Sequence, residues 1–241
     1  MIRVGIGGWT FAPWRGTFYP KGLKQADELK YSGEHLTTIE INGTFYRTQS
    51  AKSFAKWRDE TPDGFVFAVK GHRAVVNAKV LAGTGEALDW FFGSGILELG
   101  DKLGPVMWQF APFKKFDAED FGAFLKLLPR EKDGVRLRHA VEVRSKSFLV
   151  PEFIDLIRQN EVAVVYADSD DYPPIADVTA DFAYLRLQRS EEDNEAGYAD
   201  ADLDLWAERA KTFAGGGVPD GLARITDHAP PKIGRDVFVY V

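Results

Sequence analysis

Short apolar segments recur along the chain and alternate with segments whose apolar residues have helical spacing. Eight of the apolar segments are rich in Val, Ile and Phe, which is typical of buried parallel strands. They are Ile2–Ile6, Thr37–Asn42, Phe65–Lys70, Val106–Phe110, Arg138–Arg144, Val162–Asp168, Phe182–Gln188 and Asp236–Val241. The helical segments are Leu23–Leu36, Ser50–Asp59, Val80–Leu103, Ala118–Leu128, Pro151–Asn160 and Asp200–Ala214. This alternation predicts an α/β protein, a (β/α)8 TIM barrel, as a single domain over residues 1–241.

Three places depart from a regular barrel pattern. The link 169–181 contains Pro173-Pro174 and no helical spacing, so we expect a loop in place of the sixth crossover helix. The sequence ends at Val241 within the eighth strand segment, so the eighth helix is expected to be missing. The acidic stretch Ser190–Glu195 indicates a solvated loop.

Polar residues gather near the C-terminal ends of the predicted strands, where TIM barrels keep their active sites. Alternate residues of a strand face opposite sides, and the large apolar residues suit the layer beneath the helices. The polar residues expected to face the lumen are Glu40, Asn42, Lys70, Gln109, Glu142, Arg144, Asp168 and Arg186. Three acids and three bases in this set predict an ion-paired cluster. It forms either a ligand site or a salt-bridge network that only plugs the barrel.

Aromatic residues are dense after the first two strands. We expect Trp9, Trp14 and Tyr46 to form a stacking wall for a ligand, and Phe18 and Phe45 to be structural. The nearby glycines Gly5, Gly7 and Gly8 lack the spacing of a dinucleotide-binding loop, which favours a role in close backbone packing.

Composition limits the kinds of partner, metal site and cofactor that the chain is expected to have. The net charge of −6 disfavours nucleic acid and anionic membranes as partners, although it leaves room for a local basic patch. There is no cysteine, and the four histidines form no metal-binding motif, so no His-rich or Cys metal centre is expected and any cofactor is unknown. We expect His139 to be structural and single out His72 as worth examining. With no signal peptide and no membrane-length apolar run, a soluble cytoplasmic protein is expected.

Several motifs together resemble a known family. They are Gly5-Ile6-Gly7-Gly8-Trp9 with Phe18-Tyr19-Pro20, Glu40-Ile41-Asn42-Gly43-Thr44-Phe45-Tyr46, Gln109-Phe110-Ala111-Pro112 and Glu142-Val143-Arg144. In these motifs the chain resembles the domain of unknown function 72 (YecE-like) family. Phe67-Ala68-Val69-Lys70, Asp168 and Tyr184-Leu185-Arg186 continue the resemblance, which runs over nearly the whole chain. It implies a TIM barrel and no established activity. The chain departs from the family at Gln188, where a histidine is usual, and lacks the Asn-rich segment after the last strand.

Three functions remain open at this point. The first is an enzyme acting on a small polar ligand, such as a sugar or sugar phosphate. Glu142, Asp168 and Glu40 would then supply acid–base chemistry. Lys70, Arg144 and Arg186 would hold an anionic group, with Asn42, Gln109, Trp9, Trp14 and Tyr46 completing the ligand site. The second is a nucleic-acid-binding or repair barrel, by analogy of fold. The third is a non-catalytic ligand-binding protein.

Overall fold

Eight parallel strands close into a barrel in the computed structural model of the chain, which describes residues 1–191 and 197–241. Around the barrel the strands follow one another as β1, β2, β3, β4, β7, β8, β9 and β10, and β10 pairs with β1. Their bounds are Ile2–Gly7 (β1), Thr38–Ile41 (β2), Val66–Lys70 (β3), Leu103–Phe110 (β4), His139–Val143 (β7), Ala163–Asp168 (β8), Phe182–Leu187 (β9) and Asp236–Tyr240 (β10). The predicted TIM barrel and its eight strand segments are confirmed, and most of the acidic stretch Ser190–Glu195 falls outside the described residues.

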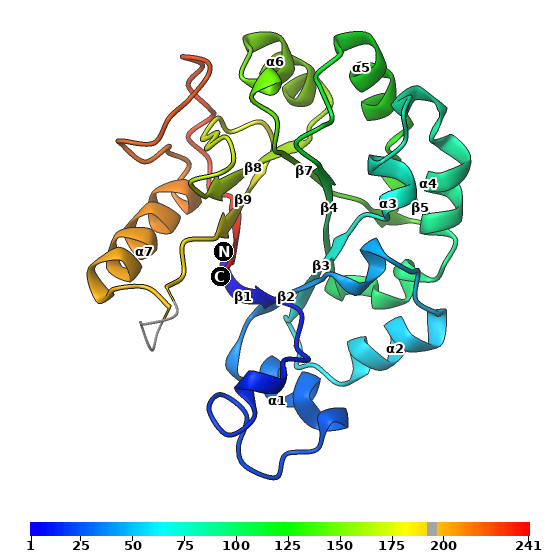
Figure 1. Ribbon diagram of the computed structural model, residues 1–241, viewed down its shortest axis with the longest axis vertical. Helices are drawn as coiled ribbons and strands as arrows, with labels where there is room; N and C mark the ends of the chain where they lie inside the picture. Colours follow the sequence, from blue (N-terminus) through cyan, green and yellow to red (C-terminus); the bar gives the residue numbers. More distant parts are fainter. Residues whose placement is uncertain (192–196) are drawn as a thin grey trace.

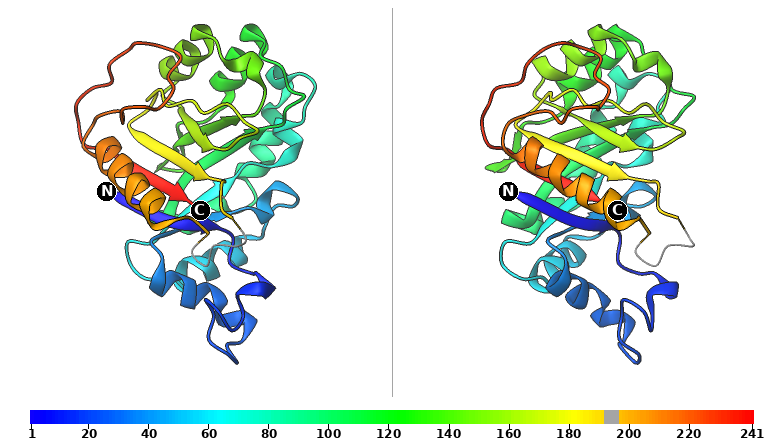
Figure 2. Two further views of the ribbon diagram at one scale, coloured as in Figure 1. Left: turned by 60° about the vertical axis from the view of Figure 1, so that its left-hand side comes forward. Right: turned by 90° about the vertical axis from the view of Figure 1, so that its left-hand side faces the viewer.

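Helices surround the barrel, and Figure 1 looks onto the end at which the strands finish. The α-helices are Glu28–His35 (α1), Ala51–Asp59 (α2), Arg73–Val76 (α3), Gly85–Phe92 (α4), Ala118–Leu127 (α5), Pro151–Gln159 (α6) and Asp200–Ala214 (α7). Short 3₁₀ turns are Ala12–Trp14, Gln25–Asp27, Gly43–Phe45, Leu81–Gly83, Ile96–Lys102 and Lys146–Phe148. The side views of Figure 2 show the strands running together from one end of the barrel to the other.

The helix starts follow from local sequence. Asp117 accepts a hydrogen bond from the amide of Asp120 at 3.0 Å and caps α5, and Ser50 caps α2 in the same way at 3.2 Å. Pro151 begins α6, where its missing N–H is not needed.

The predicted helix Val80–Leu103 is wrong as a single element. Gly93 follows the end of α4, and Gly95 has a φ of +107°. A Cβ on Gly95 would stand 2.5 Å from the Cα of Ala51, so the chain turns there and continues as a 3₁₀ helix into β4. Helix α1 is also shorter than the predicted Leu23–Leu36.

A loop replaces the sixth crossover helix, as predicted, since residues 169–181 contain no helix. The carboxylate of Asp177 fastens this loop to the long connection 215–235, accepting hydrogen bonds from the amides of Ile225 (2.6 Å) and Thr226 (3.0 Å). Strand β10 ends one residue before Val241, and α7 contacts both β10 and β1 on the outside of the barrel. The loop 169–181 and α7 thus cover the outside of this part of the barrel.

The core has an outer and an inner layer. Phenylalanines dominate the outer layer, where the rings of Phe121, Phe148 and Phe153 pack edge to face against one another. The inner layer holds smaller residues such as Ala68, Met107 and Ala140, with Phe182 and Phe238 towards its N-terminal end. A hairpin that the sequence analysis did not predict, Glu131–Lys132 (β5) and Val135–Arg136 (β6), turns at Asp133 and Gly134, both with positive φ.

Candidate functional site

Five of the predicted polar residues converge at the C-terminal end of the lumen. Paired positions in parallel strands share a face, and the register places Gln109 beside Glu142 and Glu40 beside Ala68. Arg186 completes this face from β9, and Lys70 ends β3. The parity argument is therefore correct for strands β2, β3, β4, β7 and β9.

Glu142 is the most heavily bonded carboxylate of the cluster. It is fully buried, and its Oε1 accepts hydrogen bonds from Arg144 Nε (2.6 Å) and Gln109 Nε2 (2.9 Å). Its Oε2 accepts from Arg186 Nη1 at 2.6 Å. Burial acts to raise the pKa of Glu142, but Arg186 and Arg144 outweigh it and hold that pKa below its ordinary value. Glu142 thus stays ionised and orients two guanidinium groups.

Glu40 is the second fully buried carboxylate, and Arg186 bridges it to Glu142. Arg186 Nη2 donates to Glu40 Oε1 at 3.1 Å, and the hydroxyl of Tyr184 donates to Oε2 at 2.5 Å. Burial opposes the charge of Arg186, but the two glutamates raise its pKa. Burial and the neighbouring Glu40 raise the pKa of Tyr184 well above its ordinary value, so its proton stays on the phenol.

Lys70 differs from the two arginines because its Nζ makes no hydrogen bond or ion pair with any residue that the structure describes. The ammonium group lies 5.0 Å above the ring of Phe45, in a cation–π contact. Its backbone carbonyl accepts a 2.7 Å hydrogen bond from Thr44 Oγ1, which fixes the end of β3. Burial and the nearby Arg186 lower the pKa of Lys70, although Glu40 and Glu142 partly offset this.

The cluster therefore has more cations than anions. Lys70, Arg144 and Arg186 supply three positive charges, and Glu40 and Glu142 supply two negative ones, which leaves one positive charge when Lys70 is protonated. A partly buried excess charge is costly unless a counter-ion meets it. The arrangement favours an anionic ligand.

A pocket of about 260 Å³ adjoins this cluster at the barrel mouth. Its lining includes Gly7, Trp14, Asn42, Arg186 and Tyr240, together with Gln188, the position that departs from the family pattern. The Oδ1 of Asn42 is buried and has no hydrogen-bond partner among the described residues. A Cβ on Gly7 would stand 2.7 Å from Asn42 Nδ2 and 4.0 Å from Glu40 Oε1. Glycine at this position leaves room for the Asn42 side chain at the pocket.

Asp168 does not join the cluster, which corrects its predicted lumen position. In β8 the residue beside Arg186 is Ala167, so Asp168 faces outward with Tyr166, whose ring packs on Trp206 of α7. Its Oδ1 lies 3.4 Å from Arg189 Nε. Burial raises the pKa of Asp168, although Arg189 and Arg209 oppose the shift. Asp168 is therefore not brought together with Glu142 and Glu40, the other carboxylates expected to supply acid–base chemistry.

The predicted stacking wall is only partly present. Trp9 packs edge-on against Trp57 of α2 (5.0 Å between ring centroids) and belongs to the outer core, so its predicted place in the wall is wrong. Trp14 lines the pocket. Tyr46 is 68% exposed and is absent from the pocket lining, while Phe45, expected to be purely structural, contacts Lys70.

The two histidines of interest have structural partners. His72 caps α3, and its Nδ1 accepts from the amide of Ala74 at 3.1 Å. His139 accepts from Trp108 Nε1 at 3.2 Å and pairs through Nε2 with the carbonyl of Pro129 at 2.8 Å. Burial lowers the pKa of His139 to about 4, which keeps the ring neutral.

Sequence reasoning missed four supporting residues. Tyr184 bonds Glu40, and the hydroxyls of Tyr240 and Thr38 lie 2.9 Å apart beside it. Tyr172, in the loop after β8, lies with its ring 4.1 Å from the guanidinium carbon of Arg144. The alternation of residues along the strand already placed Tyr184 on the same face as Arg186. A tyrosine on that face was the sequence signal that could have identified it as a partner of the polar cluster.

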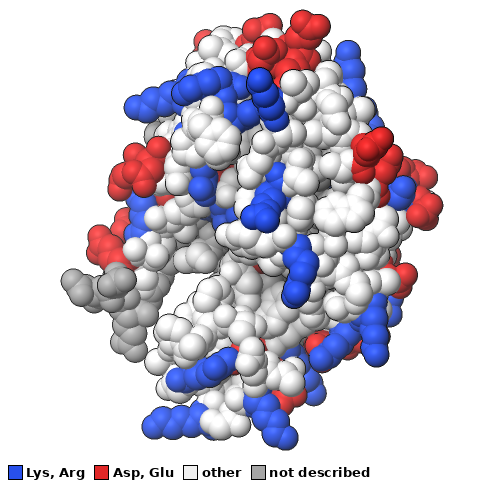
Figure 3. All heavy atoms as spheres, turned by 45° about the vertical axis from the view of Figure 1, so that its right-hand side comes forward, with Lys and Arg blue, Asp and Glu red and all other residues white. Residues whose placement is uncertain are grey.

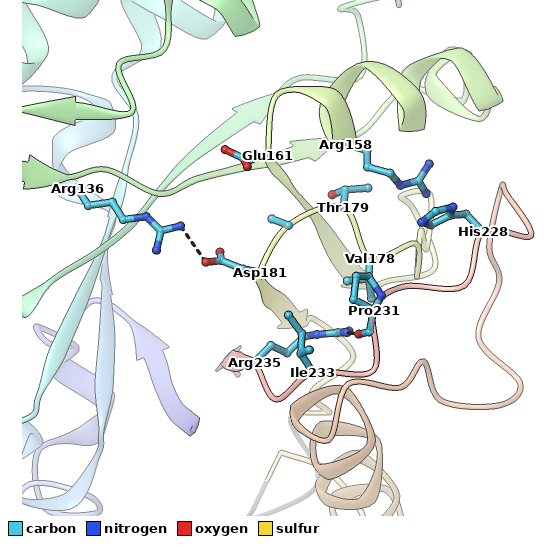
Figure 4. A pocket seen from close by; sticks show the side chains of 11 residues that line it. Arg136, Arg158, Glu161, Val178, Thr179, Asp181, His228, Pro231, Ile233 and Arg235 are labelled. Atoms are coloured by element: carbon cyan, nitrogen blue, oxygen red, sulfur yellow. Dashed lines mark hydrogen bonds and ion pairs between the residues drawn. The ribbon is translucent and has the colours of Figure 1, made fainter.

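A second pocket, of about 320 Å³, lies at the opposite end of the barrel, among residues that precede strands (Figure 4). Its polar groups largely satisfy one another: Arg136 pairs with Asp181 at 2.8 Å, and Arg235 donates to the carbonyls of Gly216 and Pro231. This end of a TIM barrel generally serves stability. The mouth cluster is the better candidate site.

Two further findings concern the described part of the chain. None of its helices combines the length and apolar character needed to cross a membrane. No three His, Asp or Glu side chains within residues 1–191 and 197–241 lie close enough together to hold a metal ion.

Comparison with known proteins places this geometry in a family. The model of a protein family of unknown function, DUF72, matches residues 3–227. The chain belongs to the DUF72 family. The UPF0759 protein YunF of Bacillus subtilis is 25% identical over 160 residues, which cover 64% of this chain and 55% of YunF. The match therefore spans about half the length of that relative.

Solved structures of DUF72 family proteins have the same fold. One from Thermotoga maritima superposes with a TM-score of 0.73 at 23% identity, covering 100% of this chain and 91% of its own. One from Enterococcus faecalis gives a TM-score of 0.69 at 18% identity, covering 100% and 89%. These likenesses establish the barrel, and the DUF72 family model itself carries no activity.

Proposed function

We propose that this DUF72 protein is an enzyme that binds a small anionic polar ligand, such as a sugar phosphate, at the barrel mouth. The observation that carries the proposal is the excess of positive charge around Arg186, next to a pocket whose lining includes the polar side chains of Asn42, Arg186 and Gln188. Arg186 would bind the anionic group, and Asn42, with its unpartnered Oδ1, would bind a hydroxyl. A cytoplasmic setting is part of this proposal.

The proposal gives the carboxylates different roles from those expected. Both carboxylate oxygens of Glu142 already accept hydrogen bonds, so we assign Glu142 the role of positioning Arg144 and Arg186. Glu40 lies close to the pocket, since its Oε1 would stand 4.0 Å from a Cβ on Gly7, which lines it. Lys70 is the candidate for proton transfer because it has no ionic partner within the described chain and its pKa is lowered.

Calorimetric titration with glucose 6-phosphate, inorganic phosphate and glucose tests the binding step. We expect the phosphates to bind and glucose to bind far more weakly. Lys70→Met should weaken phosphate binding by about tenfold, or ~1.4 kcal/mol. Lys132→Gln, a change of lysine on β5 at the other end of the barrel, is the matched control and should have no effect.

The pH dependence sharpens this test. The ammonium form of Lys70 attracts the anion, so affinity should fall as pH rises through its pKa, which lies below the ordinary value for lysine. The Lys70→Met variant should lack this part of the pH profile. Equal binding of glucose and glucose 6-phosphate, or an unchanged profile in Lys70→Met, would contradict the proposal. Tight binding with no chemical change of the ligand, followed by NMR, would favour a non-catalytic binding protein.

A further inference from the structure

Three loops at the barrel mouth are joined side by side. The ammonium group of Lys114, after β4, donates to the carbonyls of Ala78 (3.0 Å) and Lys79 (3.1 Å) in the connection after β3. On the other side the amide of Phe116 donates to Ser147 Oγ at 2.9 Å, in the loop after β7. These contacts make a continuous rim from the end of β3 to the end of β7.

The rim is basic although the chain as a whole is acidic. The connections 42–50, 71–84, 111–117 and 144–150, which follow β2, β3, β4 and β7, contain one acid, Asp117. Their bases are Arg47, Arg73, Lys79, Lys114, Lys115, Arg144 and Lys146. By contrast, residues 169–176, which directly follow β8, include two acids, Asp170 and Asp171, and no base. Positive charge is therefore concentrated on one half of the mouth.

Several of these bases are free to meet a partner. Arg47, Arg73, Lys79 and Lys146 are exposed, and none of their side chains makes an ion pair within the described chain. Figure 3, an oblique view of this face, shows Lys and Arg side chains in its middle as well as at its edges, whereas Asp and Glu lie mostly at its edges.

Exposed aromatic side chains accompany the bases. Phe113 is 69% exposed on the loop after β4, and Tyr46 is 68% exposed next to Arg47. Trp90 of α4 is 50% exposed, and its ring lies 4.8 Å from that of His72, beside Arg73. Exposed aromatic rings thus lie on, or next to, the connections that carry the free cations.

We propose that this rim, defined by Arg47, Arg73, Lys79, Lys146, Tyr46, Trp90 and Phe113, binds a single-stranded nucleic acid. Cations that follow a phosphate backbone and aromatic rings that stack on bases are the two components of such surfaces. An acidic protein or polysaccharide would use the cations but would not require the rings. The rim residues are separate from Lys70, Arg186 and the pocket, so this inference goes beyond the proposed small-ligand site.

Fluorescence anisotropy with labelled oligo-dT and oligo-U of about 20 nucleotides tests the proposal, with heparin as a polyanion lacking bases. Binding should weaken steeply between about 50 and about 300 mM salt. The double variant Tyr46→Ala/Phe113→Ala should lose roughly tenfold or more in affinity for the strand, because base stacking is lost. It should bind heparin as the wild type does.

Charge variants provide the matched control. Arg73→Gln/Lys146→Gln should weaken strand binding and reduce its salt dependence, whereas Lys132→Gln/Arg136→Gln, the same charge change on the β5–β6 hairpin, should not. Inorganic phosphate binding should be unchanged in all rim variants, so failure of the rim proposal and failure of the small-ligand site are distinguishable. Absence of strand binding at low salt, or an equal loss in the hairpin control, would overturn the rim proposal. Unaltered strand binding by Tyr46→Ala/Phe113→Ala would also overturn it, since it would show attraction to any polyanion.

Discussion

The two ends of the barrel lumen each contain an arginine paired with a carboxylate, but their surroundings differ. At the N-terminal end, Arg138 pairs with Asp236 at 3.0 Å and lies over the rings of Phe182 (5.4 Å) and Phe238 (5.1 Å). At the C-terminal end, Arg186 bridges two fully buried carboxylates and also lines a pocket. The aromatic rings close one end, and the other remains polar and accessible.

This difference shows that an ion pair inside a barrel is not in itself evidence of a site. The Arg138 pair is consistent with a seal, because the guanidinium group lies over two aromatic rings. The Arg186 cluster includes Lys70, which lacks an ionic partner within the described chain, and it adjoins the unpartnered Oδ1 of Asn42. Unsatisfied polar groups beside open space distinguish a candidate binding site from a plug.

The largest expected effect comes from Arg186→Gln. Both Glu40 and Glu142 would lose a buried cationic partner, so the free energy of unfolding should fall by about 3–5 kcal/mol. Urea denaturation measures this loss, and phosphate titration should show that binding is abolished. Arg186→Lys restores the charge without the forked geometry that bridges Glu40 and Glu142, and it should recover part of the stability. Full stability and full phosphate binding in Arg186→Gln would contradict the distinction drawn between the two ends of the barrel lumen.

A smaller effect is expected from Gly7→Ala, which adds a methyl group at the pocket. The new Cβ would stand 2.7 Å from Asn42 Nδ2, so the Asn42 side chain has to move. Phosphate-ester affinity should fall by roughly tenfold, or ~1.4 kcal/mol. The melting temperature should change little, because the displaced atom is the end of a flexible side chain. A large loss of stability with unchanged affinity would mean that Gly7 serves packing alone.

The smallest effect should come from Arg138→Met at the sealed end. Its pair with Asp236 is partly exposed, so we expect a loss of about 1 kcal/mol in the free energy of unfolding. Phosphate binding should stay within about twofold of the wild type, because the two ends act independently. If Arg138→Met reduced ligand affinity as strongly as Arg186→Gln does, the distinction between seal and site would be wrong.

Most of the fold could be predicted because short segments of the sequence determine its strands and helices. Each strand segment carries its own run of β-branched and aromatic residues, and Pro173-Pro174 marks the missing crossover helix. The helix Val80–Leu103 was overestimated because the constraint at Gly95 comes from Ala51, a residue distant in sequence. Local spacing cannot report such a contact.

The site was predictable to the extent that strand parity decides it. Glu40, Lys70, Gln109, Glu142 and Arg186 were all placed correctly on this basis. Asp168 was assigned inward because it is polar and ends a strand, yet the small residues Ala163, Val165 and Ala167 of β8 occupy the inward positions. The bond between Tyr184 and Glu40 joins residues 144 apart in the sequence, so nothing local could reveal it.

The closure of the barrel by β1 and β10 also has a consequence for the time course of folding. Contacts that support the site join residues 144 (Tyr184 and Glu40), 146 (Arg186 and Glu40) and 202 (Thr38 and Tyr240) positions apart. Closing such long loops costs chain entropy before any contact compensates for it, so these interactions should form late. Ligand-binding capacity is therefore expected to emerge in the slowest refolding phase. A fragment ending before Asp236 would lack it, however much helix and sheet it retains.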